Sequence, residues 1–140
     1  EADGLDFIEI SGAFHAGVAQ RHVRPGRGEA YYAPLARRFR EALGIGVIAV
    51  GGFRSLAAMN GAVAEGACDL VALSRPLIRQ PDLPRILARG GESECLSCNL
   101  CLFSRKDPPT RCHSLESRPA RGAAPPASAH TGKCPGTRPS

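Results

Sequence analysis

The chain has 140 residues, 43% of them hydrophobic, which is enough to form one packed domain. Its net charge of +5 does not indicate a nucleic-acid partner, because residues 1–112 hold 14 basic against 12 acidic residues. The excess lies in a tail without an aromatic residue on which a base could stack. Because no apolar run approaches about 18 residues and no basic leader is present, we expect a cytoplasmic protein without membrane span or signal peptide.

The sequence opens on Glu1-Ala2-Asp3 rather than on an initiating Met. We therefore interpret it as starting partway through a longer protein, so that its main partner is the missing N-terminal part of the same polypeptide. The oligomeric state does not follow from the sequence.

Three short apolar runs rich in Val and Ile predict strands at Phe7–Ile10, Val47–Val50 and Leu70–Leu73. Their nearly continuous apolarity predicts burial on both faces. Between them, an amphipathic pattern predicts a helix from Tyr32 to Leu43, and an Ala-rich stretch predicts a second one over Leu56–Glu65.

The second predicted helix has recognisable end signals, since Ser55 can cap its N-terminus and Gly66 can close it in a left-handed conformation. A short helix is expected at Leu83–Arg89. Strands alternating with helices predict an α/β fold with parallel pairing, either a barrel or a doubly wound sheet. We place an α/β unit at residues 1–90, a cysteine-rich segment at 91–113 and a disordered tail at 114–140.

Two turns at strand ends have the composition of a phosphate site. Gly51-Gly52 follows the second strand, and Ser74-Arg75 follows the third. Glycine lets a phosphate approach the backbone, and Arg offers a planar, permanently charged fork of donors. The paired turns predict a phosphate cradle, and the alternative is a tight turn beside a solvated arginine.

The cysteines are strongly clustered. Cys95, Cys98, Cys101 and Cys112 lie within 18 residues, which in a reduced compartment indicates a metal site rather than disulfides. Three cysteines at three-residue steps favour a [4Fe–4S] cluster over zinc, which usually takes two separated pairs, and the absence of any metal is a third interpretation. Cys68 is expected to be a buried apolar residue, and Cys134 to be incidental.

Two histidines and two tyrosines are further candidates for a functional role. His15 and His22 lie in the long loop after the first strand and could act as acid or base, but no nucleophile or paired carboxylate accompanies them. Tyr31 and Tyr32 precede the amphipathic pattern, and packing is the favoured interpretation of both.

Several segments in order resemble the NADH:flavin oxidoreductase, or Old Yellow Enzyme, family. They are Gly-Leu-Asp-Phe-Ile-Glu-Ile-Ser at 4–11, Tyr-x-Pro-Leu-Ala at 32–36, Val-Ile-Ala-Val-Gly-Gly at 47–52, the run from Asp69 to Leu83, and Cys-Leu-Ser-Cys-Asn-Leu-Cys at 95–101. The sequence is most similar to the branch with a cysteine cluster after the barrel, which includes 2,4-dienoyl-CoA reductase and trimethylamine dehydrogenase. The Cys-x2-Cys-Asn-x-Cys run is its most specific piece.

This resemblance implies the last three strands of an FMN-binding (β/α)8 barrel. Gly51 and Gly52 would hold the FMN phosphate with Ser74 and Arg75, where many relatives have Gly-Arg instead of Ser-Arg. The four clustered cysteines would ligate the [4Fe–4S] cluster.

The resemblance also implies an enzyme that transfers hydride from NAD(P)H to a small-molecule substrate, an electron-poor alkene or a related acceptor. No catalytic residue is expected within this chain, because the family's substrate-binding residues would precede Glu1, so the fragment alone should be inactive. The alternatives are another phosphate-binding barrel enzyme and a small metal-binding interaction module.

Overall fold

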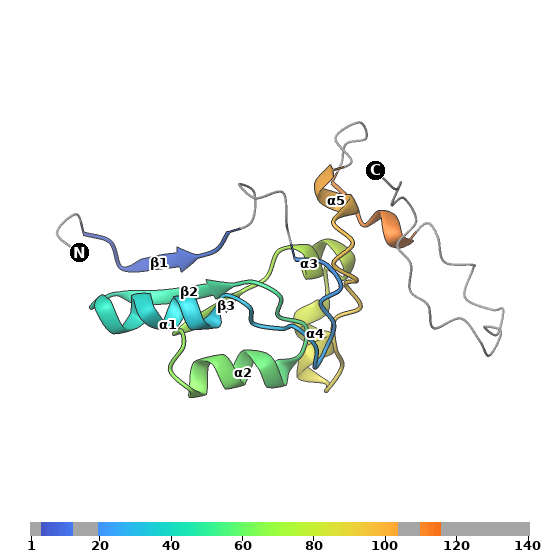
Figure 1. Ribbon diagram of the computed structural model, residues 1–140. Helices are drawn as coiled ribbons and strands as arrows, with labels where there is room; N and C mark the ends of the chain where they lie inside the picture. The colour runs from blue at the N-terminus through green and yellow to red at the C-terminus, as the bar shows by residue number, and fades with distance from the viewer. Residues whose placement is uncertain (1–3, 13–19, 104–109, 116–140) are drawn as a thin grey trace.

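A computed structural model describes residues 4–12, 20–103 and 110–115 of the chain. Its centre is a three-stranded parallel sheet in the order β1-β2-β3 (Figure 1). The strands are β1 (Phe7–Ile10), β2 (Gly46–Val50) and β3 (Leu70–Ala72). The prediction of three parallel strands is confirmed, with boundaries that differ by at most one residue. The fold class is α/β, compatible with part of a barrel.

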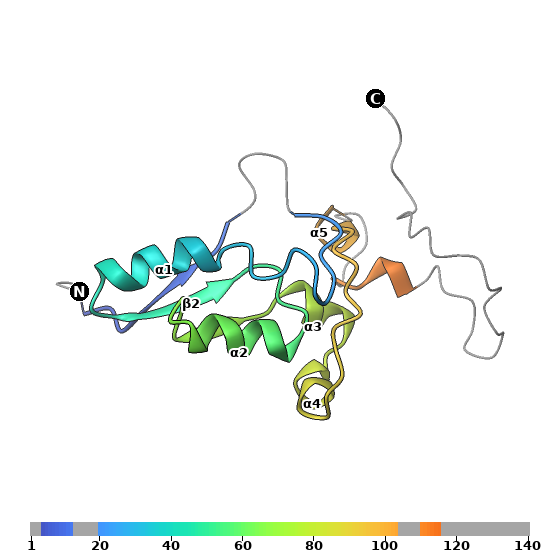
Figure 2. The same cartoon turned by 60° about the horizontal axis from the view of Figure 1, so that its bottom comes forward.

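The two crossover helices are α1 (Ala33–Ala42) and α2 (Leu56–Ala64). The predicted end signals of α2 are confirmed: Ser55 Oγ accepts a hydrogen bond from the Ala58 N–H at 3.2 Å, and Gly66 is left-handed, with φ of +69°. In the view of Figure 2, α1 is drawn above β2 and α2 below it.

The hydrophobic core lies between the sheet and these helices. Val47 and Ala49 of β2 are fully buried, and they belong to one cluster with Ala36 of α1 and Ala62 of α2. Alanines at the contact let both helices approach the sheet closely. Cys68 is 1% exposed within the same cluster, and burial raises the pKa of its thiol, so the predicted apolar role is confirmed.

The expected burial of the strands on both faces is not observed. Phe7 of β1 and Leu70 of β3 are about half exposed, at 52% and 50%. On α1, Leu35 and Phe39 are also exposed, although the amphipathic pattern placed them on the buried side. A sheet of three strands is too narrow to cover the whole apolar face of a helix. In the described part of the chain, α1 and α2 both pack on the side of β2 that carries Val47 and Ala49.

The remaining helices lie beyond the carboxyl ends of the strands (Figure 1). They are α3 (Arg75–Arg79), α4 (Leu83–Ala88), α5 (Leu100–Phe103) and a 3-10 turn at His113–Leu115. The prediction of α4 is confirmed to within one residue. Helix α3 was not predicted, because the segment from Pro76 to Arg89 carries three prolines, which disfavour helix interiors. A proline in the first helical turn is harmless, since its missing N–H would have no partner there.

Some predictions fall outside the described residues. His15 and Cys134 belong to this group, as does the predicted disordered tail except for residues 114 and 115, which end the 3-10 turn. Within the described part of the chain, none of the helices has the length and apolarity needed to cross a membrane.

Asp69, which lies between α2 and β3, connects this part of the chain to β2 by a hydrogen bond. Its carboxylate accepts hydrogen bonds from the Val47 N–H at 2.8 Å and from Arg40 Nε at 3.0 Å. The Val47 N–H, together with the Arg40 guanidinium, lowers the pKa of this carboxyl. The charged form is therefore favoured in the folded state.

We expect Asp69→Asn to lower the free energy of unfolding at neutral pH, because the amide cannot accept both bonds. A lowered pKa contributes stability that is present above the unfolded value, about 3.9, and is lost as the pH falls through the folded value. The difference from wild type in urea unfolding should therefore shrink below about pH 4. Asp82→Asn is the control, since Asp82 is exposed and its side chain caps nothing. A difference that is constant down to pH 2 would contradict this role.

Candidate functional site

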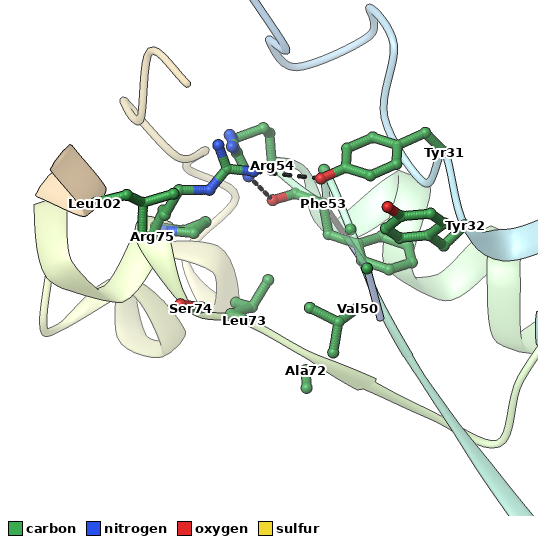
Figure 3. A pocket seen from close by; sticks show the side chains of 14 residues that line it. Tyr31, Tyr32, Val50, Phe53, Arg54, Ala72, Leu73, Ser74, Arg75 and Leu102 are labelled. Carbon is green, nitrogen blue, oxygen red and sulfur yellow. Dashed lines mark hydrogen bonds between the residues drawn. The ribbon is translucent and has the colours of Figure 1, made fainter. Parts of the chain in front are cut away.

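A cavity of about 140 Å³ opens where β2 and β3 end. Because Val50 pairs with Ala72 in the parallel register, the turns that follow these two strands are neighbours. Gly51 and Gly52 line the cavity from one turn, and Ser74 and Arg75 line it from the other. The structure thus brings together all four residues of the predicted cradle, of which Ser74 and Arg75 are labelled in Figure 3.

The two glycines are required by their backbone conformation and by their neighbours. Gly51 has φ of +142° and Gly52 has φ of +79°, values that L residues rarely adopt. A Cβ on Gly51 would lie 2.6 Å from Tyr32, and one on Gly52 would lie 2.6 Å from Tyr31. The Gly52 N–H is buried and forms no hydrogen bond with another described residue, so it remains as a donor for a ligand.

Tyr31 and Tyr32 lie on one side of this cavity and Arg75 on the other (Figure 3). The two rings contact each other edge to face, with centroids 4.8 Å apart. Tyr32 immediately precedes α1 rather than packing within it. Both tyrosines do pack, as expected, but their partners are each other and the glycines of a distant turn, which no local pattern in the sequence indicates.

The Arg75 side chain is half buried and held by three acceptors. Nη1 donates to Asn99 Oδ1 and, at 3.4 Å, to the Gln20 carbonyl, while Nη2 donates to the Tyr31 hydroxyl at 3.2 Å. The alternative of a solvated surface arginine is thus wrong. The Ser74 side chain makes no hydrogen bond with a described residue, so its hydroxyl remains as a donor.

The electrostatics of the cavity favour an anion. Among the described residues that line it, Arg54 and Arg75 are basic and none is acidic. The walls are otherwise largely apolar, which strengthens the attraction between a guanidinium and a bound anion. These residues fit the phosphate group of a nucleotide or flavin.

A carboxylate already fills the other anion-binding position nearby, the N-terminus of α2. Glu29 Oε2 accepts from the backbone N–H groups of Arg54 and Ser55, and Oε1 accepts from Ser55 Oγ and the Gly26 N–H. A helix N-terminus is a natural place for a negative charge. Because Glu29 supplies this charge, the N–H groups of Arg54 and Ser55 at this helix start already have their acceptor.

The cysteine-rich segment is attached to the α/β part by arginines. Arg54 is 1% exposed, and it donates to the Cys95 carbonyl at 3.2 Å and to Ser97 Oγ at 2.6 Å. Arg24 donates to the Leu96 carbonyl at 2.7 Å. The role of these arginines is not visible in the sequence, because nothing local distinguishes a buried arginine from an exposed one.

Arg79 contacts the far end of the segment. It pairs with Glu94 at 2.9 Å and lies 3.8 Å from Cys112 Sγ. Burial opposes the charge on Arg79, but the hydrogen bonds with Glu94 and Cys112 outweigh it, so the pKa of Arg79 is raised.

The four candidate ligand cysteines are all free thiols, and they lie in one region. Burial raises the pKa of Cys101, and Cys95, Cys98 and Cys112 are close enough to raise it further. Within the described residues, however, no three His, Cys, Asp or Glu side chains gather closely enough to hold a metal ion. Four thiols are the donor set of a [4Fe–4S] cluster, but the described residues do not arrange them as a closed metal site.

The segment also carries an unusual backbone. Ser97 and Asn99, on either side of Cys98, have positive φ values of +51° and +65°. Both residues are almost completely buried. Non-glycine residues in this conformation are uncommon and tend to occur at ligand sites. His22 also has a positive φ, but it is exposed and lines no described pocket.

The chain is similar to several curated oxidoreductases. It is 37% identical over 91 residues to the NADH-dependent flavin oxidoreductase iccE of Talaromyces variabilis. This alignment covers 59% of the present chain and 22% of that protein. It is 30% identical over 110 residues to an NADH oxidase of Thermoanaerobacter brockii, covering 75% and 17%. A bilirubin reductase of Mediterraneibacter gnavus is 28% identical over 104 residues, covering 72% and 16%. No family model matches the sequence.

The chain therefore spans about a fifth of the length of the curated relatives that it matches. These relatives are oxidoreductases, and two have names that specify NADH. The similarity supports the resemblance to flavin oxidoreductases in its broad form, without distinguishing the branch.

We expect Glu29→Ala to destabilise the protein by about 1–3 kcal/mol, because the substitution leaves several N–H groups at the start of α2 without their acceptor. Chemical denaturation monitored by circular dichroism measures this loss. Glu41→Ala removes an exposed carboxylate from α1 and should change stability by less than about 0.5 kcal/mol. An equal change in the free energy of unfolding for the two substitutions would show that Glu29 does not stabilise the start of α2.

Proposed function

We propose that this chain is the C-terminal part of an FMN-dependent oxidoreductase that transfers hydride from NAD(P)H to an electron-poor alkene or a related acceptor. The observation that carries the proposal is the basic pocket formed by Gly51, Gly52 and Arg75 at the carboxyl ends of parallel strands. This is the edge at which α/β folds and barrels bind phosphate groups. The flavin and NADH in the relatives' names are the second line of support.

In this proposal the chain holds the phosphate end of FMN. The Gly52 N–H, the Ser74 hydroxyl and the Arg75 guanidinium would donate to its oxygens. FMN, when bound, supplies the redox chemistry by accepting two electrons and a proton equivalent as hydride and passing them to the acceptor. The residues that bind and protonate that acceptor would lie in the preceding part of the polypeptide, so this chain alone would be inactive.

We further propose that Cys95, Cys98, Cys101 and Cys112 hold a [4Fe–4S] cluster. The support is the mutual proximity of the four thiols and the buried guanidinium of Arg54 close to Cys95. None of the described carboxylates forms an ion pair with that guanidinium. A buried charge without a counter-ion is costly, and an anionic thiolate cluster would supply one. Cluster assembly would draw the thiols together.

The runner-up function of a separate metal-binding module is less well supported. Arg24, Arg54 and Arg79 attach the cysteine-rich segment to residues of the α/β part by hydrogen bonds. An independent module would not need buried arginines from its neighbour. Another phosphate-binding barrel enzyme would explain the pocket but not the thiols.

We expect Arg75→Ala to weaken FMN binding by roughly 10- to 150-fold, the equivalent of about 1.5–3 kcal/mol for a lost charge-assisted pair. Titration of the flavin-free full-length protein with FMN measures this change. Arg75→Lys should restore part of the affinity, because it keeps the charge but lacks the planar fork. Arg38→Ala, on the exposed side of α1, is the control and should leave affinity unchanged. Unchanged affinity in Arg75→Ala would show that the phosphate binds elsewhere.

We expect protein purified without oxygen to carry iron and sulfide and to absorb broadly in the visible range, which zinc does not. Each Cys→Ser change at positions 95, 98, 101 and 112 should lower the iron content. Cys68→Ser and Cys134→Ser are the matched controls and should not lower it. Stoichiometric zinc, or protein that stays free of iron after anaerobic reconstitution, would contradict the cluster.

A further inference from the structure

The Arg75 guanidinium joins the pocket to the cysteine-rich segment. It receives its orientation from Tyr31, which comes from the loop before α1, and from Asn99, which lies between Cys98 and Cys101. Figure 3 shows the bond between Arg75 and the Tyr31 hydroxyl across the pocket. The Asn99 bond reaches the same guanidinium from the cysteine-rich segment.

Some N–H donors of the Arg75 guanidinium have acceptors among the described residues, and others do not. A guanidinium has five N–H donors. Both donors of Nη1 are used, by Asn99 Oδ1 and the Gln20 carbonyl, and one donor of Nη2 is used by Tyr31. The Nε–H and the second Nη2–H form no hydrogen bond with a described residue. These two donors sit on neighbouring nitrogens, as a bidentate contact to a phosphate requires.

Asn99 is well placed to fix this orientation. It is 2% exposed, and its φ of +65° is a conformation that Asn tolerates better than most residues. The segment around it is held in turn, because Arg54 donates to Ser97 Oγ and Arg24 donates to the Leu96 carbonyl. The backbone that carries the Asn99 amide is therefore fixed together with the cysteine-rich segment.

We propose that Asn99 is a positioning residue of the phosphate pocket. By occupying Nη1 of Arg75, it turns the edge formed by Nε and Nη2 towards the ligand and makes the affinity for phosphate depend on the cysteine-rich segment. The inference rests on the proposed function, since it takes the ligand to be a flavin that carries a phosphate. It adds a specific role for an asparagine that neither binds the ligand nor ligates the cluster.

The test compares FMN with riboflavin, which has the same ring system without the phosphate. Flavin-free full-length protein is titrated with each ligand, and quenching of flavin fluorescence gives the two dissociation constants. Asn99→Ala should weaken FMN binding by roughly 3- to 30-fold, the range expected for coupling between contacting residues. Riboflavin affinity should change by less than about twofold. Asn60→Ala, at an exposed position of α2, is the matched control for both ligands.

A double-mutant cycle separates positioning from a general effect on the fold. If Asn99 acts through Arg75, adding Asn99→Ala to Arg75→Ala should weaken FMN binding no further. Asn99→Gly is the second variant in case the alanine variant does not fold. Glycine adopts a positive φ without strain and, like alanine, removes the amide that accepts from Arg75, so FMN affinity should again fall while riboflavin affinity holds.

The outcomes distinguish this inference from the proposed function. If Arg75→Ala leaves FMN affinity unchanged, the phosphate pocket itself is wrongly assigned and both fail. If Arg75→Ala weakens FMN binding but neither Asn99 variant does, the positioning role alone is overturned. A parallel loss of FMN and riboflavin affinity in the Asn99 variants would also overturn it, since a merely structural residue would affect both ligands.

Discussion

The burial of Arg54 is the constraint on which the rest of this structure depends. A guanidinium that is 1% exposed must have hydrogen-bond acceptors, and it finds them in the Phe53 carbonyl, the Cys95 carbonyl and Ser97 Oγ. Burial lowers the pKa of Arg54, while the nearby Cys95 opposes that shift. Satisfying this one side chain requires the cysteine-rich segment to fold back onto the turn after β2.

With that segment in place, three other arginines also donate hydrogen bonds to residues of the cysteine-rich segment. Arg24 reaches its Leu96 carbonyl, Arg75 reaches Asn99, and Arg79 reaches Glu94 and the neighbourhood of Cys112. Charge-assisted bonds of this kind are stronger than neutral ones, particularly where water is excluded. The pocket and the thiols are therefore not two separate features, since the residues that shape one also hold the other. A ligand that orders the pocket should therefore also order the cysteine-rich segment, and the reverse should hold as well.

Local sequence signals predicted most of the strands and helices, but not which of their side chains are buried. The strands were identifiable from short apolar runs, and α2 from the cap at Ser55 and the left-handed Gly66, because these depend on a few neighbouring residues. Helix α3 was missed because the three prolines from Pro76 to Arg89 disfavour a helix unless its start is known. The exposure of Phe7 and Leu70 was missed because the number of layers around a strand is not encoded within the strand.

The sequence by itself determined the order of strands and helices, the Gly51-Gly52 and Ser74-Arg75 turns at strand ends, and the spacing of the four clustered cysteines. Parallel strands bring their carboxyl ends to one edge, so the meeting of the two turns also followed from sequence reasoning. Only the tertiary structure placed Tyr31 over Gly52, Glu29 at the start of α2 and Asn99 against Arg75. These partners are 21 to 26 residues apart, and side chains of common types leave no local pattern that identifies a distant partner.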